Sequence, residues 1–118
     1  MSTDVKTIGP EETVSKASQI MAENDIGCLP VVENEKIMGI VTERDMVKKI
    51  IAHHKNPEEI KVKEIMSKNP KTIDINTTFL EVSKMMTENV FRRTIITKQG
   101  KIEGIITSKD IVRMLATE

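Results

Sequence analysis

Aromatic side chains are almost absent from this 118-residue chain, which has no Trp, no Tyr and only two Phe. Proteins that bind single-stranded nucleic acid stack bases on aromatic side chains, so this composition disfavours that function. Lys and Arg together number 18, as do Asp and Glu, so no net charge attracts nucleic acid or an anionic membrane surface. Neither nucleic acid nor a membrane is therefore expected as a partner.

The chain also has few of the features that mark secretion or membrane insertion. Cys28 is the single cysteine, which excludes an intrachain disulfide and a metal site built from several cysteines. No apolar run approaches membrane-spanning length, and the first residues form no apolar signal segment. The expected localisation is cytoplasmic.

Signals for catalysis are missing as well. No Ser, Cys or His stands in a sequence context typical of a nucleophile, and no pair of carboxylates suggests acid–base catalysis. His53 and His54 are adjacent, but Glu58 and Glu59 lie beyond Pro57 and form no recognised metal-ligand spacing with them. The sequence therefore predicts neither an enzyme nor a metal site.

What the chain does contain is an internal repeat. A shift of 65 residues aligns 1–53 with 66–118 without a gap and gives 17 identities. Such a repeat fixes the architecture before any local signal is considered. A unit of about 50 residues buries too little surface to be stable alone, so the two copies are expected to share a core. The predicted organisation is a first repeat at 1–54, a linker at 55–65 and a second repeat at 66–118.

Each copy predicts the same order of elements, β-α-β-β-α, from its apolar periodicity and turn signals. In the first copy these are an extended segment at 5–8, a helix capped by Thr13, strands at 28–32 and 37–41, and a second helix from Thr42 with apolar positions Met46, Val47, Ile50 and Ile51. In the second copy they are 71–73, a helix capped by Thr78, strands at 94–97 and 102–106, and a helix from Thr107. A connector at 53–63 leads into a short helical turn near 62–66.

The most specific motif runs from Gly39 to Asp45 and recurs from Gly104 to Asp110. In each copy a strand ends at a Thr, a helix begins there, and an Asp follows within the first helical turn. A Thr at the N-cap with an Asp three residues later caps a helix without any ligand. The same corner also suits a nucleoside phosphate, because helix N-terminal N–H groups attract phosphate and a carboxylate accepts hydrogen bonds from ribose hydroxyls. Both interpretations stand at this point.

With its duplicated motif, and with Leu29-Pro30-Val31-Val32 as the middle strand, the chain resembles a pair of cystathionine-β-synthase-type (CBS) domains, the Bateman module. The resemblance covers nearly the whole chain. It implies an α+β fold of two repeats packed with pseudo-two-fold symmetry, and clefts that take AMP, ADP, ATP or S-adenosylmethionine.

By position in the motif, the resemblance assigns a role to several residues in each copy. It implies that Asp45 and Asp110 accept ribose hydroxyls and that Thr42 and Thr107 lie beside the phosphate. It further implies that Ile8 and Ile73 flank the adenine, while backbone groups around Thr7 and Thr72 read the edge of the base.

The two copies are not equivalent in charge. Residues 1–65 carry nine basic and twelve acidic side chains, a net charge of −3, whereas residues 66–118 carry nine and six, a net charge of +3. The second copy has Arg92 and Arg93 where the first has Gly27 and Cys28, and the resemblance implies phosphate binding at the position of Arg92. Without a ligand, such an arginine pair is expected at a solvated strand edge, and Arg44 and Lys109 are expected on helix surfaces. If the cations do bind phosphate, the second site is the stronger one.

The expected function is that of a non-enzymatic regulatory module that binds an adenosine-containing ligand and requires no cofactor. It would act as a homodimer, through the helices that bear Ile20-Met21 and Met85-Met86, or through a regulated protein that the sequence does not identify. The alternative is a structural oligomerisation module with no bound nucleotide.

Overall fold

A computed structural model describes residues 5–68, 70, 72–74 and 93–107 of the chain. The chain divides into two compact units, one formed by Lys6–Pro70 and the other by residues 1–5 together with 71–118. These units are a different division from the predicted sequence repeats, because residues 66–70 fold with the first unit. The helices predicted from 79 and after Thr107 lie outside the described residues.

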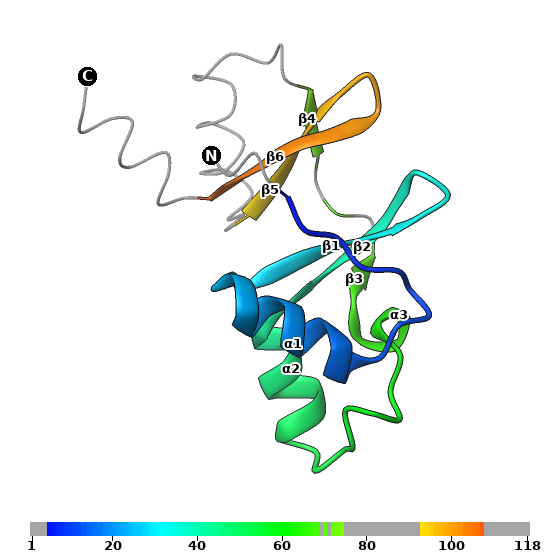
Figure 1. Ribbon diagram of the computed structural model, residues 1–118, viewed down its shortest axis with the longest axis vertical. Helices are drawn as coiled ribbons and strands as arrows, with labels where there is room; N and C mark the ends of the chain where they lie inside the picture. The colour runs from blue at the N-terminus through cyan, green and yellow to red at the C-terminus, as the bar shows by residue number, and fades with distance from the viewer. Residues whose placement is uncertain (1–4, 69, 71, 75–92, 108–118) are drawn as a thin grey trace, which may run out of the picture. The chain divides into compact units, whose positions relative to one another are not determined.

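The first unit is built on a three-stranded antiparallel sheet (Figure 1). Its strands, in the spatial order β1-β2-β3, are β1 (Cys28–Glu33), β2 (Lys36–Thr42) and β3 (Ser67–Lys68). The β1–β2 hairpin confirms the two strands predicted from β-branched runs. Its tip is a two-residue turn in which both central residues, Asn34 and Glu35, have positive φ, at 50° and 65°. This tip geometry matches the twist of a tight hairpin.

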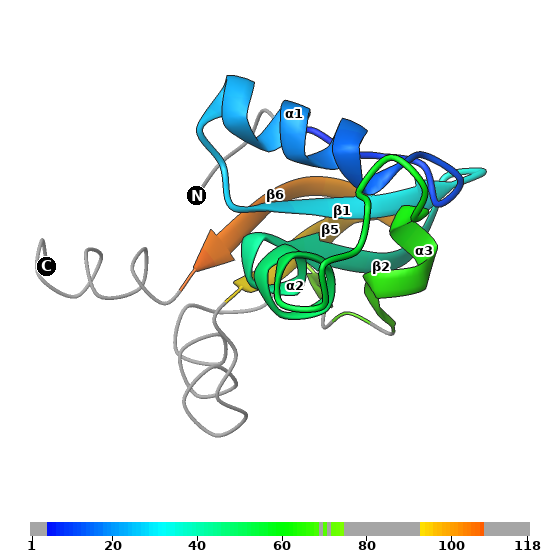
Figure 2. The same ribbon diagram turned by 90° about the horizontal axis from the view of Figure 1, so that it is seen from below.

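Helices cover one face of this sheet (Figures 1 and 2). They are α1 (Val14–Asn24), α2 (Glu43–Met46), a π-helical turn η1 (Val47–Ile51) that continues α2, and α3 (Val62–Ile65). The predicted cap of α1 is confirmed, because the Lys16 N–H donates to the Thr13 hydroxyl oxygen at 3.1 Å. The short helical turn predicted after the connector is α3.

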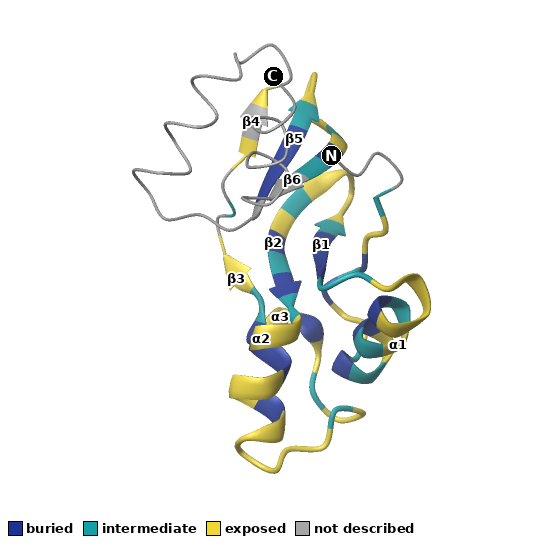
Figure 3. Ribbon diagram, turned by 90° about the vertical axis from the view of Figure 1, so that its left-hand side faces the viewer, coloured by how far each residue is buried: buried dark blue, intermediate teal, exposed yellow. Residues whose placement is uncertain are grey.

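The core of the first unit lies between the sheet and these helices. Buried apolar side chains come from every element except β3 (Figure 3): Ile8, Val14, Ala17, Met21, Leu29, Val31, Val41, Met46, Ile50, Val62 and Ile65. The apolar stripe predicted on the second helix is only half buried. Met46 and Ile50 face the core, whereas Val47 and Ile51 are 55% and 66% exposed. Helical periodicity identified the apolar residues of this helix but did not tell the core-facing pair from the exposed pair.

Backbone hydrogen bonds join the N-terminal end of α1 and the segment before it to the start of α3. The Val62 N–H donates to the Glu12 carbonyl at 2.8 Å, and the Val14 N–H donates to the Ile60 carbonyl at 2.9 Å. On the surface, the Glu11 carboxylate accepts hydrogen bonds from Lys61 at 2.7 Å and from Lys63 at 2.8 Å. These two ammonium groups lower the pKa of the Glu11 carboxyl from 4.5 to about 2.

The second unit contains the sheet β4 (Thr72–Asp74), β5 (Arg93–Lys98) and β6 (Lys101–Thr107), in that spatial order. Strand β4 pairs with β5 in parallel, and β5 with β6 antiparallel. The three strands predicted for the second copy are thus confirmed.

The hydrogen-bond register of the two units repeats with the same offset of 65 residues as the sequence. The pair Cys28↔Thr42 becomes Arg93↔Thr107, and the register shift after Val31 recurs after Ile96. In the first unit, the extended segment predicted at 5–8 forms no strand and pairs with β1 through the parallel bridge Ile8↔Val31. The equivalent pair in the second unit is Ile73↔Ile96, between β4 and β5. The duplication therefore preserves backbone pairing where side chains have diverged.

Gly39 allows β3 to approach β2 closely. An added Cβ at this position would lie 2.5 Å from the Ser67 carbonyl oxygen and 2.9 Å from the Met66 sulfur. Gly39 pairs with Lys68, and Ile40 with Ser67. The glycine of the repeated motif therefore has a steric role in the first unit, since only a residue without a side chain fits there.

Candidate functional site

The Thr42–Asp45 corner stands where β2 ends and α2 begins. Thr42 has extended backbone angles (φ −129°, ψ 164°) and caps the helix. Its hydroxyl oxygen accepts from the Asp45 N–H at 3.1 Å, while its own N–H donates to Asp45 Oδ2 at 3.0 Å. The Thr42 hydroxyl in turn lies 3.1 Å from Asp45 Oδ2, to which it donates. The capping box predicted from the sequence is thus formed in full.

The carboxylate of this corner has a third partner. Asp45 is only 9% exposed, and its Oδ1 lies 3.2 Å from the ammonium nitrogen of Lys49, one helical turn further on. The same ammonium group donates to the Ile65 carbonyl at the end of α3, at 2.7 Å. Lys49 therefore links the motif carboxylate to the last carbonyl of another helix.

The helix N-terminus beside this corner is also largely satisfied. The Glu43 N–H donates to the Gly27 carbonyl at 3.0 Å, and the Asp45 N–H is taken by the Thr42 hydroxyl oxygen. A helix N-terminus attracts phosphate through N–H groups that lack partners. In the first unit, two of the first three helical N–H groups are used within the protein.

The other site residues predicted in the first copy are more widely spread. Arg44 lies within the corner, between Thr42 and Asp45, and is exposed on the surface of α2. Ile8 is buried in the core, and its backbone forms hydrogen bonds with the β1 residues on either side of Val31. The Ile8 N–H donates to the Pro30 carbonyl at 3.0 Å, and the Ile8 carbonyl accepts from the Val32 N–H at 2.9 Å. Thr7 is exposed.

The second copy repeats the backbone frame of this corner. Thr107 is the last residue of β6 and pairs with Arg93, as Thr42 pairs with Cys28. Thr72, whose side chain is exposed, and Ile73 lie in β4. The remaining predicted site residues, Arg92, Lys109 and Asp110, lie outside the described residues.

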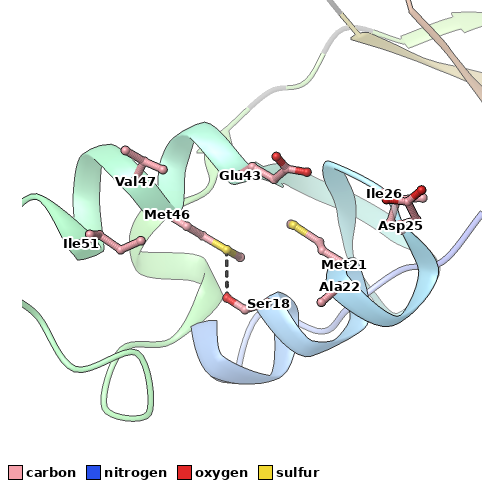
Figure 4. A pocket seen from close by; sticks show the side chains of 9 residues that line it. All are labelled: Ser18, Met21, Ala22, Asp25, Ile26, Glu43, Met46, Val47 and Ile51. Carbon is pink, nitrogen blue, oxygen red and sulfur yellow. Dashed lines mark hydrogen bonds between the residues drawn. The ribbon is translucent and has the colours of Figure 1, made fainter.

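A pocket of about 350 Å³ opens between α1 and the helix formed by α2 and η1 (Figure 4). Across this pocket, the Ser18 hydroxyl of α1 donates to the Met46 sulfur of α2 at 3.0 Å. Its wall includes the exposed side chains of Val47 and Ile51. The full lining is Ser18, Met21, Ala22, Asp25, Ile26, Glu43, Met46, Val47 and Ile51. We call this the α1–α2 pocket.

Two residues that shape the corner, Lys49 and Gly27, are not among the site residues predicted from the sequence. Lys49 stands four positions after Asp45, a spacing at which an acid followed by a base interacts on a helix, so the signal was present. Gly27 acts through its carbonyl, which every residue has, so no sequence signal could identify it. Met21, on a helix predicted to contact a dimer partner, is itself buried in the core of the first unit.

Within 5–68, 70, 72–74 and 93–107, no three His, Cys, Asp or Glu side chains are grouped so that they could hold a metal ion. None of the described helices has the length and apolarity needed to cross a membrane.

Comparison with protein families gives a match that covers most of the chain. The CBS domain model matches residues 1–52 and again residues 62–117. A protein of Methanopyrus kandleri is 36% identical over 113 residues, 94% of this chain and 58% of its own length. Hypoxic response protein 1 of Mycobacterium tuberculosis is 32% identical over 116 residues, 98% of this chain and 81% of its own length. The chain thus spans little more than half of the first relative and most of the second.

Solved structures agree with these matches. A protein with CBS domains from Burkholderia ambifaria has a TM-score of 0.88 at 30% identity, over 99% of this chain and 86% of its own. A hexameric CBS-CP12 protein from bloom-forming cyanobacteria has a TM-score of 0.85 at 30% identity, over 95% of this chain and 66% of its own. The predicted α+β fold with two tandem repeats is confirmed.

Proposed function

The chain belongs to the CBS-domain family, and on that premise we propose that it is a non-enzymatic regulatory module that binds adenosine-containing ligands. The ligand class is AMP, ADP, ATP or S-adenosylmethionine, bound reversibly as a regulatory ligand. The observation that carries the proposal is the repetition of one strand-to-helix corner: Thr42 and Thr107 end equivalent strands in identical register, and an Asp follows each by three residues.

The second repeat is the stronger binding site in this proposal. Asp110 accepts the ribose hydroxyls, and Thr107 lies beside the phosphate with Arg92 and Lys109 as cationic partners. Ile73 flanks the adenine, and backbone groups near Thr72 read its edge. The net charge of +3 on residues 66–118 favours an anionic ligand in this half of the chain.

Regulation follows if the ligand binds one conformation of the chain better than another. A ligand shifts a conformational equilibrium only by its difference in affinity for the two states. The output then passes to a partner protein or across a homodimer.

A structural oligomerisation module remains the second candidate, and one observation favours it. Val47 and Ile51 are large apolar side chains that stay more than half exposed on the wall of the α1–α2 pocket. Apolar surface of this kind marks many protein–protein contacts. The hexameric state of the cyanobacterial CBS-CP12 protein shows that a relative assembles.

The first experiment is thermal unfolding of the whole chain with each of the four ligands. A ligand at about 100 times its dissociation constant should stabilise the folded protein by roughly 2.7 kcal/mol. Asp110→Asn should then bind at least tenfold more weakly and should melt within a few degrees of the wild type, because asparagine keeps the size but loses the charge that strengthens hydrogen bonds to ribose hydroxyls. Glu103→Gln, on an exposed position of β6, is the matched control and should bind normally.

Failure has a distinct signature. If no ligand shifts the melting curve at millimolar concentration, the oligomerisation module is the better account. Light scattering then decides it: Ile51→Ser should lower the mass of the assembly, while Met38→Ser, which changes an exposed apolar residue of β2, should not. An Asp110→Asn protein that unfolds while its folded fraction binds normally would show that Asp110 only caps its helix.

A further inference from the structure

We propose that Lys49 occupies the carboxylate of the first repeat and thereby confines nucleotide binding to the second repeat. This inference rests on the proposed function and adds to it which corner is open. Lys49 acts through Asp45, so it is a positioning residue and not a ligand contact. The residue that the 65-residue offset aligns with Lys49 is Met114, which carries no charge.

The hydrogen bonds of Asp45 limit what it can still accept. An ionised carboxylate offers about four lone-pair positions. The Thr42 N–H and the Thr42 hydroxyl fill two of them at Oδ2, and the Lys49 ammonium group fills one at Oδ1. One position remains, whereas the 2′- and 3′-hydroxyls of a ribose require two acceptors. A ribose can bind fully only if one internal partner leaves.

Of these partners, Lys49 is the one whose removal leaves the corner intact. The two bonds to Thr42 form the capping box that starts α2, so losing them would disturb the end of the strand and the helix. Lys49 is attached from outside the corner, by a side chain that is 45% exposed. Its release would free both lone pairs of Oδ1 and leave the Thr42–Asp45 geometry unchanged.

The second acceptor of Lys49 keeps it in place. Its ammonium group donates to the Ile65 carbonyl at 2.7 Å, shorter than its 3.2 Å contact with Asp45. A helix leaves its last carbonyls without internal partners, and a lysine side chain can satisfy one of them. A ligand at the first corner would therefore have to displace a cation that is held at two points.

The offset places the cations of the two repeats differently. In the first repeat, Lys49 lies on the motif carboxylate, and Gly27 stands at the position of Arg92. In the second repeat, Met114 stands at the position of Lys49, and Arg92 is present. The substitutions at both positions favour ligand binding in the second repeat, since they leave its carboxylate without this lysine and supply a cation for the phosphate.

The experiment measures how many AMP molecules the full-length chain binds, by equilibrium dialysis with radiolabelled AMP. The wild type should bind one AMP per chain in the micromolar to submillimolar range. Lys49→Met should bind two, and the added site should prefer AMP over 2′-deoxy-AMP at least tenfold, because Asp45 then reads the ribose. Lys49→Arg should still bind one, because the arginine keeps the ion pair. Lys48→Met removes an exposed lysine one residue earlier and should also bind one.

Two additional variants guard against a folding defect. Lys49→Gln keeps a donor for the Ile65 carbonyl without the charge, and should also gain a second AMP. Met114→Lys places the lysine in the second repeat and should weaken the wild-type site at least tenfold, while circular dichroism remains that of the folded protein.

Each alternative result has a clear meaning. If the wild type already binds two AMP with equal affinity, or if Lys49→Met and Lys49→Gln still bind one, the inference is wrong and the proposed function stands. If Lys49→Met weakens AMP binding, Lys49 is itself a phosphate contact and the inference is again wrong. If neither wild type nor any variant binds AMP or the other three ligands, the proposed function fails and the inference fails with it.

Discussion

Replacing Gly39 by alanine tests why the repeated motif begins with glycine. The added methyl group would lie 2.5 Å from the Ser67 carbonyl oxygen, well inside van der Waals contact. The other close atom, the Met66 sulfur at 2.9 Å, belongs to a flexible side chain and can move. The backbone oxygen cannot move without carrying β3 away from β2, so the substitution is expected to open the pairs Gly39↔Lys68 and Ile40↔Ser67.

The expected loss of stability follows from what this opening removes. In an antiparallel ladder, one of two adjacent residue pairs exchanges both N–H···O bonds, so opening the two pairs removes two hydrogen bonds. Each contributes about 0.5–1.5 kcal/mol net, which gives a loss of about 1–3 kcal/mol. Met66, partly buried against the core, would shift as well and add to the loss. We therefore expect Gly39→Ala to lower the free energy of unfolding by about 2–3 kcal/mol.

Urea denaturation followed by circular dichroism measures this change, with an unchanged slope m if the unfolded state is unaffected. Gly9→Ala is the matched control, because the nearest atom to its Cβ would be Glu12 Cγ at 3.9 Å, an ordinary contact. It should be neutral or should stabilise the protein by up to about 1 kcal/mol, through the unfolded chain. The double variant Gly39→Ala with Met66→Ala separates the contact with sulfur from the contact with the backbone.

The reasoning would be refuted if Gly39→Ala and Gly9→Ala had the same free energy of unfolding to within about 0.5 kcal/mol. It would also be wrong if removing the Met66 side chain restored the stability of Gly39→Ala. That result would place the conflict at the methionine and leave the β2–β3 pairing without a role.

Two further predictions concern the surface of the first unit. The two lysine partners of Glu11 lower its folded-state pKa to about 2, so its contribution to stability is complete above pH 4.5 and is lost as pH falls towards 2. In thermal melting, Glu11→Gln should be less stable than the wild type at pH 7 and equal to it near pH 2. Equal stability of the two proteins at pH 7 would contradict this. Glu35 has a φ of 65° at the tip of the hairpin, where the second unit has Gly100. Glu35→Gly should therefore raise the free energy of unfolding by about 0.5–1 kcal/mol in urea denaturation, because the relief of a left-handed residue exceeds the entropy that glycine adds to the unfolded chain. A lower free energy of unfolding would show that the tip is not strained.

Local signals were sufficient for much of the fold. The hairpin strands carry β-branched residues, and Thr13 and Thr42 cap helices as their positions indicated. These features depend on residues close in sequence. The extended segment at 5–8 is different: in the first unit it contributes only the bridge at Ile8, because a parallel contact with β1 depends on residues that are distant along the chain.

The remaining differences also depend on distant residues. Strand β3 has two polar residues, which carry no strand signal, and it pairs because Gly39 leaves room for it. Periodicity could not show that Val47 and Ile51 are exposed, since it cannot say which apolar positions face the core when the helix continues as a π-turn.

At the candidate site, the sequence predicted the corner itself but left open whether it caps a helix or binds a ligand. In the first repeat, Thr42 and Asp45 form both hydrogen bonds of the helix cap. The missing information was the third partner of Asp45, because the position of Lys49 depends on the Ile65 carbonyl as well as on helical spacing. The ligand assignment itself stays a prediction.

The place of β3 in the first unit also bears on aggregation. An edge strand exposes unpaired N–H and C=O groups, to which a strand of another molecule can add, and a short edge with lysine or proline resists such addition. Here β3 covers one side of β2, extends for two residues, ends at Lys68, and is followed closely by Pro70. Gly39 therefore does more than admit a neighbouring strand: by leaving room for β3, it keeps the Gly39–Ile40 part of β2 paired within the chain and away from a strand of another molecule.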